Sequence, residues 1–111
     1  MSGVKSRAMP QFDVYPHPVE EWRSQSPYVV DIQSDLVRGV RNRLTIPLTH
    51  ADVESPGQRL APTVEVEGVT LFIDTLGIAA FPLGELRGAV GSLRSDADAI
   101  WSALDYALHG Y

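Results

Sequence analysis

The feature that most constrains this chain is an alternation of apolar and polar residues with a period of two, repeatedly interrupted by proline and glycine. The alternation runs through segments 11–15, 28–33, 43–48 and 63–73. A period of two places successive side chains on opposite faces of a β-strand. Proline removes a ladder donor, and glycine permits tight turns. We therefore expect short antiparallel strands to form most of the molecule.

Two of these segments predict which side chains face the core. In 28–33, the apolar residues at 28, 30 and 32 are expected to point inward and Asp31 outward. In 43–48, Leu44 and the apolar residues at 46 and 48 are expected to point inward, which leaves Pro47 on the outer face. Proline is found in sheets mainly on edge strands or at bulges. The second segment is therefore predicted to be an edge strand or to contain a bulge.

The central part of the chain predicts a β-hairpin. Residues 63–67 and 69–73 alternate on either side of Gly68, which can adopt the positive φ of a tight connection. A short apolar strand is expected at 78–81, ended by Pro82.

The C-terminal part changes to a helical pattern. Three glycines within 83–93 allow only a short helix there. A longer helix is expected from Ser95, whose hydroxyl could accept the backbone N–H of Asp98. Gly110 stands where a C-cap glycine belongs. The apolar stripe of this helix is expected to consist of Ile100, Leu104, Ala107 and Leu108.

These elements together predict an α+β, mainly β, fold of about five antiparallel strands followed by a C-terminal helix. With 111 residues and 44% hydrophobic content, the chain should form one domain around one core. No apolar run approaches the roughly 20 residues of a membrane span. The N-terminus carries no apolar signal segment, so a soluble, cytoplasmic protein without membrane association is expected.

The N-terminal residues 1–8 are polar and patternless, and Met9 offers a second possible start. We expect 1–8 to be an upstream extension or a vector-derived tag, and residues 9–111 to be the single domain. Because Lys5 and Arg7 lie in that extension, the domain is more acidic than the formal net charge of −5 suggests. An acidic domain argues against direct nucleic-acid binding and favours a protein partner or a small ligand.

Catalytic and metal-binding patterns are absent from the sequence. There is no cysteine, which excludes disulfides, thiolate metal sites and a cysteine nucleophile. None of His17, His50 and His109 is followed, three or four positions later on a predicted helix, by a second metal-binding residue. Each is expected to be solvated or locally hydrogen-bonded. Helix capping accounts for Asp96 and Asp98. We therefore expect no catalytic residue, metal or cofactor.

Two surface features remain as candidate binding sites. Arg38, Arg41 and Arg43 place three guanidinium groups within six residues. Such a cluster is either a solvated loop or a docking patch for an acidic partner segment or a phosphate, which guanidinium groups bind well. The other feature is the end of the last helix, Leu108-His-Gly-Tyr111, which either presents a stacking group or packs Tyr111 onto the domain.

A family resemblance rests on two motifs at a fixed interval. Asp31-Ile-Gln-Ser-Asp35, followed by Arg43-Leu-Thr-Ile-Pro-Leu48, resembles the central motif of the CcdB toxin family. Residues 11–15 are similar to the family's first strand and 62–74 to its central hairpin. A terminal helix that ends one residue past a glycine is also shared, so the resemblance covers about 9–111.

The resemblance implies a fold and a function. The fold would be a small, strongly bent antiparallel sheet, an SH3-like barrel of the CcdB type, with a C-terminal helix. The protein would be a homodimer without cofactor or catalytic activity, the toxin of a type II toxin–antitoxin system that traps the cleavage complex of DNA gyrase. Its partners would be the A subunit of DNA gyrase and a small acidic antitoxin with a partly disordered tail. Autoregulation of transcription is implied as well.

The resemblance also implies the positions of the gyrase contacts. At some of these positions this chain has the family's residue type, and at others it has a different one. The family's terminal Trp-Gly-Ile is His-Gly-Tyr here, and its helix asparagine is an aspartate. An imidazole offers a smaller π-face than an indole, and Tyr111 is expected to restore part of the stacking area. The implied contacts are Leu36, Val37, Asp105, Leu108, His109, Gly110 and Tyr111.

Three functions therefore remain open at the level of the sequence. The first is a gyrase-directed toxin with an altered C-terminal tip. The second is an endoribonuclease-type toxin of the same fold, in which Arg38, Arg41 and Arg43 would stabilise charge and His50 would transfer protons. The third is an antitoxin-binding module that has lost gyrase poisoning.

Overall fold

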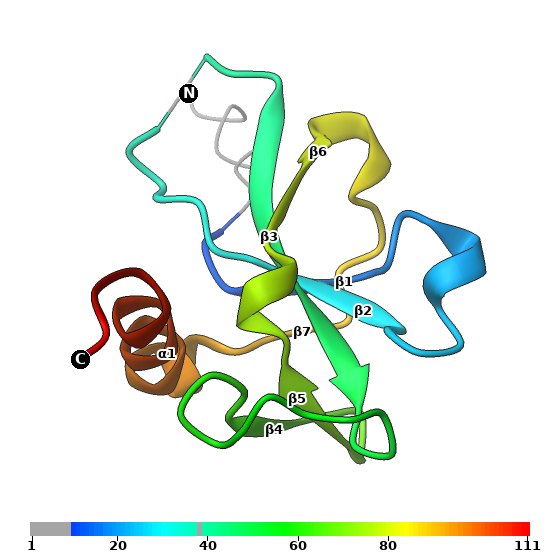
Figure 1. Ribbon diagram of the computed structural model, residues 1–111. Coiled ribbons are helices and arrows are strands. Elements are labelled where there is room, and N and C mark those ends of the chain that lie inside the picture. The colour runs from blue at the N-terminus through cyan, green and yellow to red at the C-terminus, as the bar shows by residue number, and fades with distance from the viewer. Residues whose placement is uncertain (1–9, 38) are drawn as a thin grey trace.

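The structure, a computed structural model, describes residues 10–37 and 39–111, which form one bent antiparallel sheet and a C-terminal helix (Figure 1). In this part of the chain the strand order is β4-β5-β3-β2-β1-β7, and β6 pairs with β3 beside this path. The strands are β1 (Asp13–Pro16), β2 (Tyr28–Asp31), β3 (Asn42–His50), β4 (Thr63–Val66), β5 (Val69–Ile73), β6 (Ala79–Pro82) and β7 (Gly91–Ser92). The helix is α1 (Ala97–His109).

The predicted fold class is confirmed, because the sheet curls into a nearly closed barrel with one terminal helix. The described residues contain seven strands instead of about five. The sequence did not indicate β7, since two residues are too few to alternate. The expected short helix within 83–93 is reduced to a 3-10 turn, η4 (Leu83–Glu85). The other short turns are η2 (Glu20–Trp22), η3 (Thr75–Gly77) and η5 (Arg94–Asp96).

Strand β3 is paired on both sides, so of the two alternatives predicted around Pro47, an edge strand or a bulge, the edge strand is wrong. One side of β3 pairs with β2 over Thr45–Leu48, and the other side pairs first with β6 and then with β5. Pro47 lies where the second side passes from β6 to β5, and its carbonyl accepts the N–H of Asp74 at 3.0 Å. Its missing N–H interrupts no ladder there, which explains why a proline is tolerated in a central strand.

The inward and outward faces of β2 and β3 differ from the prediction at two positions. Asp31 is fully buried, and Leu44 is 39% exposed. Asp31 is buried because both faces of the bent sheet are covered. One face carries the main core, and the other carries a second apolar cluster around Val29. Leu44, by contrast, lies in the part of β3 that pairs with β6, beyond the core residues of that strand. The main core includes Val14, Val30, Ile46, Leu48, Leu71, Ile73 and Ile100.

The predicted hairpin is confirmed, with Val66 opposite Val69 and two residues in the turn. Both turn residues have positive φ, 51° at Glu67 and 81° at Gly68. This is the requirement of a type I′ turn, whose twist matches that of the flanking strands. The Tyr28 hydroxyl donates to Glu67 Oε1 at 3.0 Å and ties the turn back to β2.

Helix α1 starts two residues later than predicted. Ser95 lies within η5, and the N-cap position is Asp96 without a side-chain hydrogen bond, so the predicted Ser95 cap is wrong. The preceding 3-10 turn replaces such a cap, since the Asp96 N–H donates to the Leu93 carbonyl at 2.8 Å. Ile100 is fully buried as expected, but Leu108 is 72% exposed because the last turn of α1 extends beyond the barrel.

Gly110 caps α1 as the sequence predicts. Its φ of 81° is left-handed, and its N–H donates to the carbonyl of Tyr106. None of the helices in the described residues is long and apolar enough to cross a membrane.

Candidate functional site

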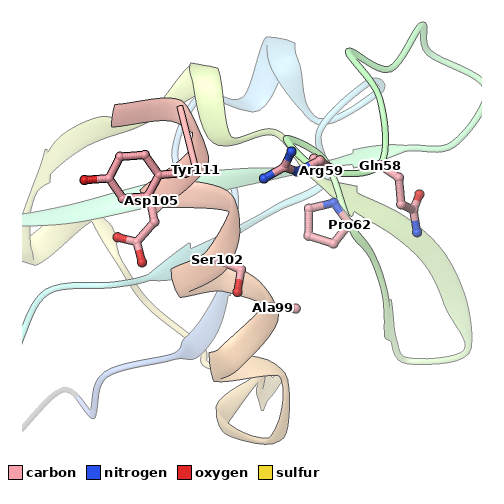
Figure 2. A pocket seen from close by; sticks show the side chains of 7 residues that line it. All are labelled: Gln58, Arg59, Pro62, Ala99, Ser102, Asp105 and Tyr111. Atoms are coloured by element: carbon pink, nitrogen blue, oxygen red, sulfur yellow. The ribbon is translucent and has the colours of Figure 1, made fainter. Parts of the chain in front are cut away.

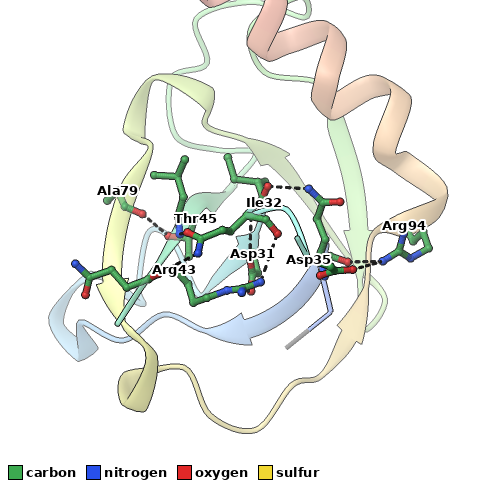
Figure 3. Close-up of polar contacts among 11 residues, drawn as sticks. Asp31, Ile32, Asp35, Arg43, Thr45, Ala79 and Arg94 are labelled. Carbon is green, nitrogen blue, oxygen red and sulfur yellow. Dashed lines mark hydrogen bonds and ion pairs between the residues drawn. The ribbon is translucent and has the colours of Figure 1, made fainter. Parts of the chain in front are cut away.

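The turn between β2 and β3 is built on a buried ion pair (Figure 3). Arg43 Nε donates to Asp31 Oδ2 at 2.9 Å, and the backbone N–H of Gln33 donates to Asp31 Oδ1 at 2.9 Å. Burial raises the pKa of Asp31, while the hydrogen bonds from Arg43 and Gln33 act in the opposite direction. The pair lies where β2 ends, beside the backbone hydrogen bond that the Ile32 N–H donates to the Leu44 carbonyl at 2.9 Å.

Gln33 continues the connection to β3 through its side chain. Its Nε2 donates to the carbonyl of Asn42 at 3.2 Å, and its Oε1 accepts the N–H of Leu44 at 3.0 Å. A side-chain amide can imitate a backbone peptide in this way because it offers both a donor and an acceptor. Gln33 therefore holds the base of the turn closed.

The last two residues of the motif fix the tip of the turn. Ser34 Oγ accepts the N–H of Leu36 at 3.1 Å, and Asp35 Oδ1 accepts the N–H of Gln11 at 2.8 Å. Leu36 is 86% exposed and Val37 44% exposed. The polar residues of the motif thus present two apolar side chains to solvent.

The predicted arginine cluster does not form one exposed patch. Arg38 lies outside the described residues, Arg41 is exposed, and Arg43 is only 8% exposed. Arg43 belongs to the interior because it neutralises Asp31. It therefore offers little surface to a docking partner.

The predicted endoribonuclease constellation is not assembled either. Arg43 and His50 lie near opposite ends of β3. At about 3.3 Å per residue they are roughly 20 Å apart along the strand, far beyond hydrogen-bond reach. Among residues 10–37 and 39–111, no group of three or more His, Asp or Glu side chains could hold a metal ion.

The C-terminal tip presents its side chains to solvent. Leu108, His109 and Tyr111 are all exposed, Tyr111 to 81%. The rings of His109 and Tyr111 lie 5.8 Å apart between centroids with an interplanar angle of 31°. Gly110 between them makes this possible, because its left-handed conformation turns the chain back after α1. The tip therefore carries two neighbouring rings on a rigid helix end.

The two groups of predicted contacts come from distant parts of the sequence, the turn between β2 and β3 and the C-terminal end of α1. Figure 1 shows this turn and α1 on the same side of the view, with the red C-terminal end of the helix nearer to the turn than its orange start. Asp105 is exposed one turn before the tip and lines a cleft next to it. Any partner that contacts all of these residues must span both groups.

The cleft beside α1 was not indicated by the sequence (Figure 2). It has a volume of about 470 Å³ and lies between residues 57–62 and α1. Its lining residues are Gln58, Arg59, Pro62, Ala99, Ser102, Asp105 and Tyr111. The Arg59 Cζ atom lies 4.0 Å from the ring centroid of Tyr106. Only the spacing of positions 99, 102 and 105 along one helix face could have suggested this site, and such a spacing is common.

The structure is a bent antiparallel barrel with one exposed helix end. A family model described as CcdB protein matches residues 11–110. The chain therefore belongs to the CcdB family. As a member it is the toxin of a type II toxin–antitoxin system, a gyrase poison and not an enzyme, with an antitoxin and gyrase as partners. A search of curated proteins found no match.

Proposed function

We propose that this toxin binds the A subunit of DNA gyrase through the tip of α1 together with the turn at Leu36 and Val37. The observation that carries the proposal is the exposed ring pair of His109 and Tyr111 at the end of α1. The complete proposed contact set is Leu36, Val37, Asp105, Leu108, His109, Gly110 and Tyr111.

The ring pair supports stacking on a cationic partner side chain. A single imidazole gives less contact than an indole, but the Tyr111 ring lies next to it and adds a second π-face. Arginine stacks on aromatic faces with about 0.5–2 kcal/mol, depending on how far the contact is desolvated. The two rings together therefore replace the single large ring found at this position in the family.

We further propose that the toxin acts as a homodimer in the cytoplasm. Exposed apolar side chains on β3 and at both ends of β6 support this, because Leu44, Ile78 and Leu83 are 39%, 41% and 42% exposed. Leu44 lies opposite Ala80 in the ladder, so apolar residues are paired across both strands. Exposed apolar patches of this kind mark protein–protein contacts. Sedimentation of the protein at micromolar concentration would test the dimer, and a monomer would refute it.

A supercoiling assay with gyrase from the same source would test the target site. We expect micromolar toxin to block supercoiling and to yield linear DNA. Leu108→Asp, on the exposed last turn, should abolish the effect, while Glu65→Ala on β4 serves as a control that should keep it. Unchanged supercoiling and no linear DNA with the parent protein would refute gyrase poisoning through this tip.

The altered tip also supports a second candidate, a module that binds the antitoxin but no longer poisons gyrase. Expression without antitoxin separates the two. Growth arrest that Leu108→Asp relieves supports the gyrase-directed toxin. Normal growth at the same level of soluble protein supports the second candidate.

A further inference from the structure

The cleft between residues 57–62 and α1 is lined by two side chains of opposite charge. Arg59 lies on the loop wall and Asp105 on the helix wall, as Figure 2 shows. No ion pair joins the two among the described residues, so neither charge is neutralised by the other. The cleft is therefore polarised, with a cationic end near Gln58 and Pro62 and an anionic end near Tyr111.

The Arg59 guanidinium is held in place through its face. It stacks on the ring of Tyr106 at 4.0 Å, and stacking leaves the N–H donors at its edge available. By contrast, Arg23 donates to the His17 carbonyl, and Arg87 to the Gly84 carbonyl. Arg59 is thus pre-oriented, whereas those two arginines are already engaged in hydrogen bonds.

A pre-oriented guanidinium fork in a cleft is suited to binding a carboxylate. Charge-assisted, bidentate hydrogen bonds from arginine to a carboxylate are among the stronger polar contacts in proteins. The surrounding chain has a formal net charge of −5, so an acidic partner is repelled from most of this surface. Arg59 offers one of the few places where such a partner can approach.

We propose that this cleft is a docking site for an acidic peptide segment, and that Arg59 is the residue that binds its carboxylate. This rests on the proposed function, because the antitoxin is expected to supply an acidic, partly disordered tail. Asp105, on the helix wall, determines how the peptide is positioned along the cleft. Its carboxylate repels a second carboxylate of the segment and favours one of the segment's N–H donors. Ser102 adds a hydroxyl on the same wall.

The site can be tested with a fluorescein-labelled peptide of about ten glutamates, followed by anisotropy at low salt. Arg59→Gln should weaken binding about tenfold, which corresponds to the loss of one charge-assisted contact of about 1.4 kcal/mol. Arg59→Lys should lose less, because it keeps the charge but not the fork. Asp105→Asn should strengthen binding, because it removes the repelling carboxylate.

Arg87→Gln is the matched control, since it removes one exposed positive charge on another part of the surface. Equal losses for Arg59→Gln and Arg87→Gln would overturn the proposal, because binding would then follow net charge alone. Tighter binding of a lysine peptide of the same length would overturn it too. Thermal melting of each variant verifies that the fold is intact.

The supercoiling assay separates this proposal from the gyrase target. Arg59 is not among the proposed gyrase contacts, so Arg59→Gln should still block supercoiling while losing affinity for the acidic peptide. If the parent protein leaves supercoiling unchanged but the peptide results hold, gyrase poisoning fails and the docking site stands. If supercoiling is blocked and Arg59→Gln binds the peptide like the parent, the docking site fails alone.

Discussion

The turn at 31–37 and the C-terminal tip at 105–111 are both proposed to contact gyrase, but the fold holds them in opposite ways. The turn is fixed by the buried pair of Asp31 and Arg43 and by hydrogen bonds from each polar residue of its motif. The tip is held by the body of α1, by the cap at Gly110 and by the contact of Arg59 with the Tyr106 ring. No buried ion pair holds it among the described residues. Changes in the turn are therefore constrained by stability, whereas changes in the tip are constrained mainly by the partner.

This difference explains which residues reveal the family. The motif that identifies the chain is largely structural, because its side chains close a turn and neutralise an interior charge. The proposed contacts at the tip are His-Gly-Tyr, where the family resemblance implies Trp-Gly-Ile, although the chain matches the family over residues 11–110. The residues that identify the family are therefore mainly structural ones in the turn, whereas the residues proposed to bind the target lie at the exposed end of α1.

The largest expected effect comes from breaking the turn. Arg43→Met leaves Asp31 buried and unpaired, which should lower the free energy of unfolding by about 3–5 kcal/mol. The double variant Asp31→Leu with Arg43→Met should recover most of this loss, since no buried charge remains. Urea unfolding checks both. A loss below about 1 kcal/mol for the single variant would show that the turn tolerates an unpaired charge.

The next effect concerns the tip alone. His109→Trp should raise gyrase affinity about tenfold, or about 1.4 kcal/mol, by restoring a large π-face. The urea midpoint should stay the same, because the residue is exposed. Calorimetry with the dimerisation domain of the gyrase A subunit measures the affinity. Weaker binding would show that the tip docks in a different orientation.

A smaller effect is expected at the junction of the tip and its helix. Gly110→Ala places a Cβ at a φ of 81°, which costs about 1 kcal/mol. No neighbouring atom lies within 4 Å of that Cβ, so the cost is conformational and not steric. Thermal unfolding detects the loss. A stability equal to that of the parent would mean that the tip reorients freely.

The smallest expected effect is a pH dependence of stability, which should come from the buried His17 and not from the exposed His109. Burial and the charge of Arg23 lower the pKa of His17, whose Nδ1 accepts the N–H of Val19. The unfolded chain therefore binds the proton first, and the free energy of unfolding should fall as pH drops below about 6.5. His17→Gln should flatten this dependence and His109→Gln should keep it. Urea unfolding of both variants and of the parent protein at about pH 7.5 and about pH 5.5 tests this prediction.

The sequence predicted the strands and the hairpin well because these depend on local alternation and on Gly68. It misplaced Asp31 because an alternation rule assumes one buried face, while the second cluster around Val29 covers the other. It misplaced Leu44 because this residue lies beyond the core, in the part of β3 that pairs with β6. The edge strand predicted from Pro47 was wrong for a related reason. The strand paired with one side of β3 changes from β6 to β5 near Pro47, and no local sequence pattern encodes this change. The cleft at Arg59 was missed because it depends on the distant approach of a loop to α1.

The pairing of β1 with β7 has a consequence for how the chain folds. Asp13 lies opposite Ser92, so this ladder joins the first and the last strand of the described chain across most of the sequence. Contacts between such distant residues require a large loop to close and slow folding down. The β4–β5 hairpin, with a two-residue turn, can form within microseconds. We therefore expect the hairpin to nucleate early and the closure of β1 on β7, which precedes α1, to limit the rate at which the binding tip is assembled.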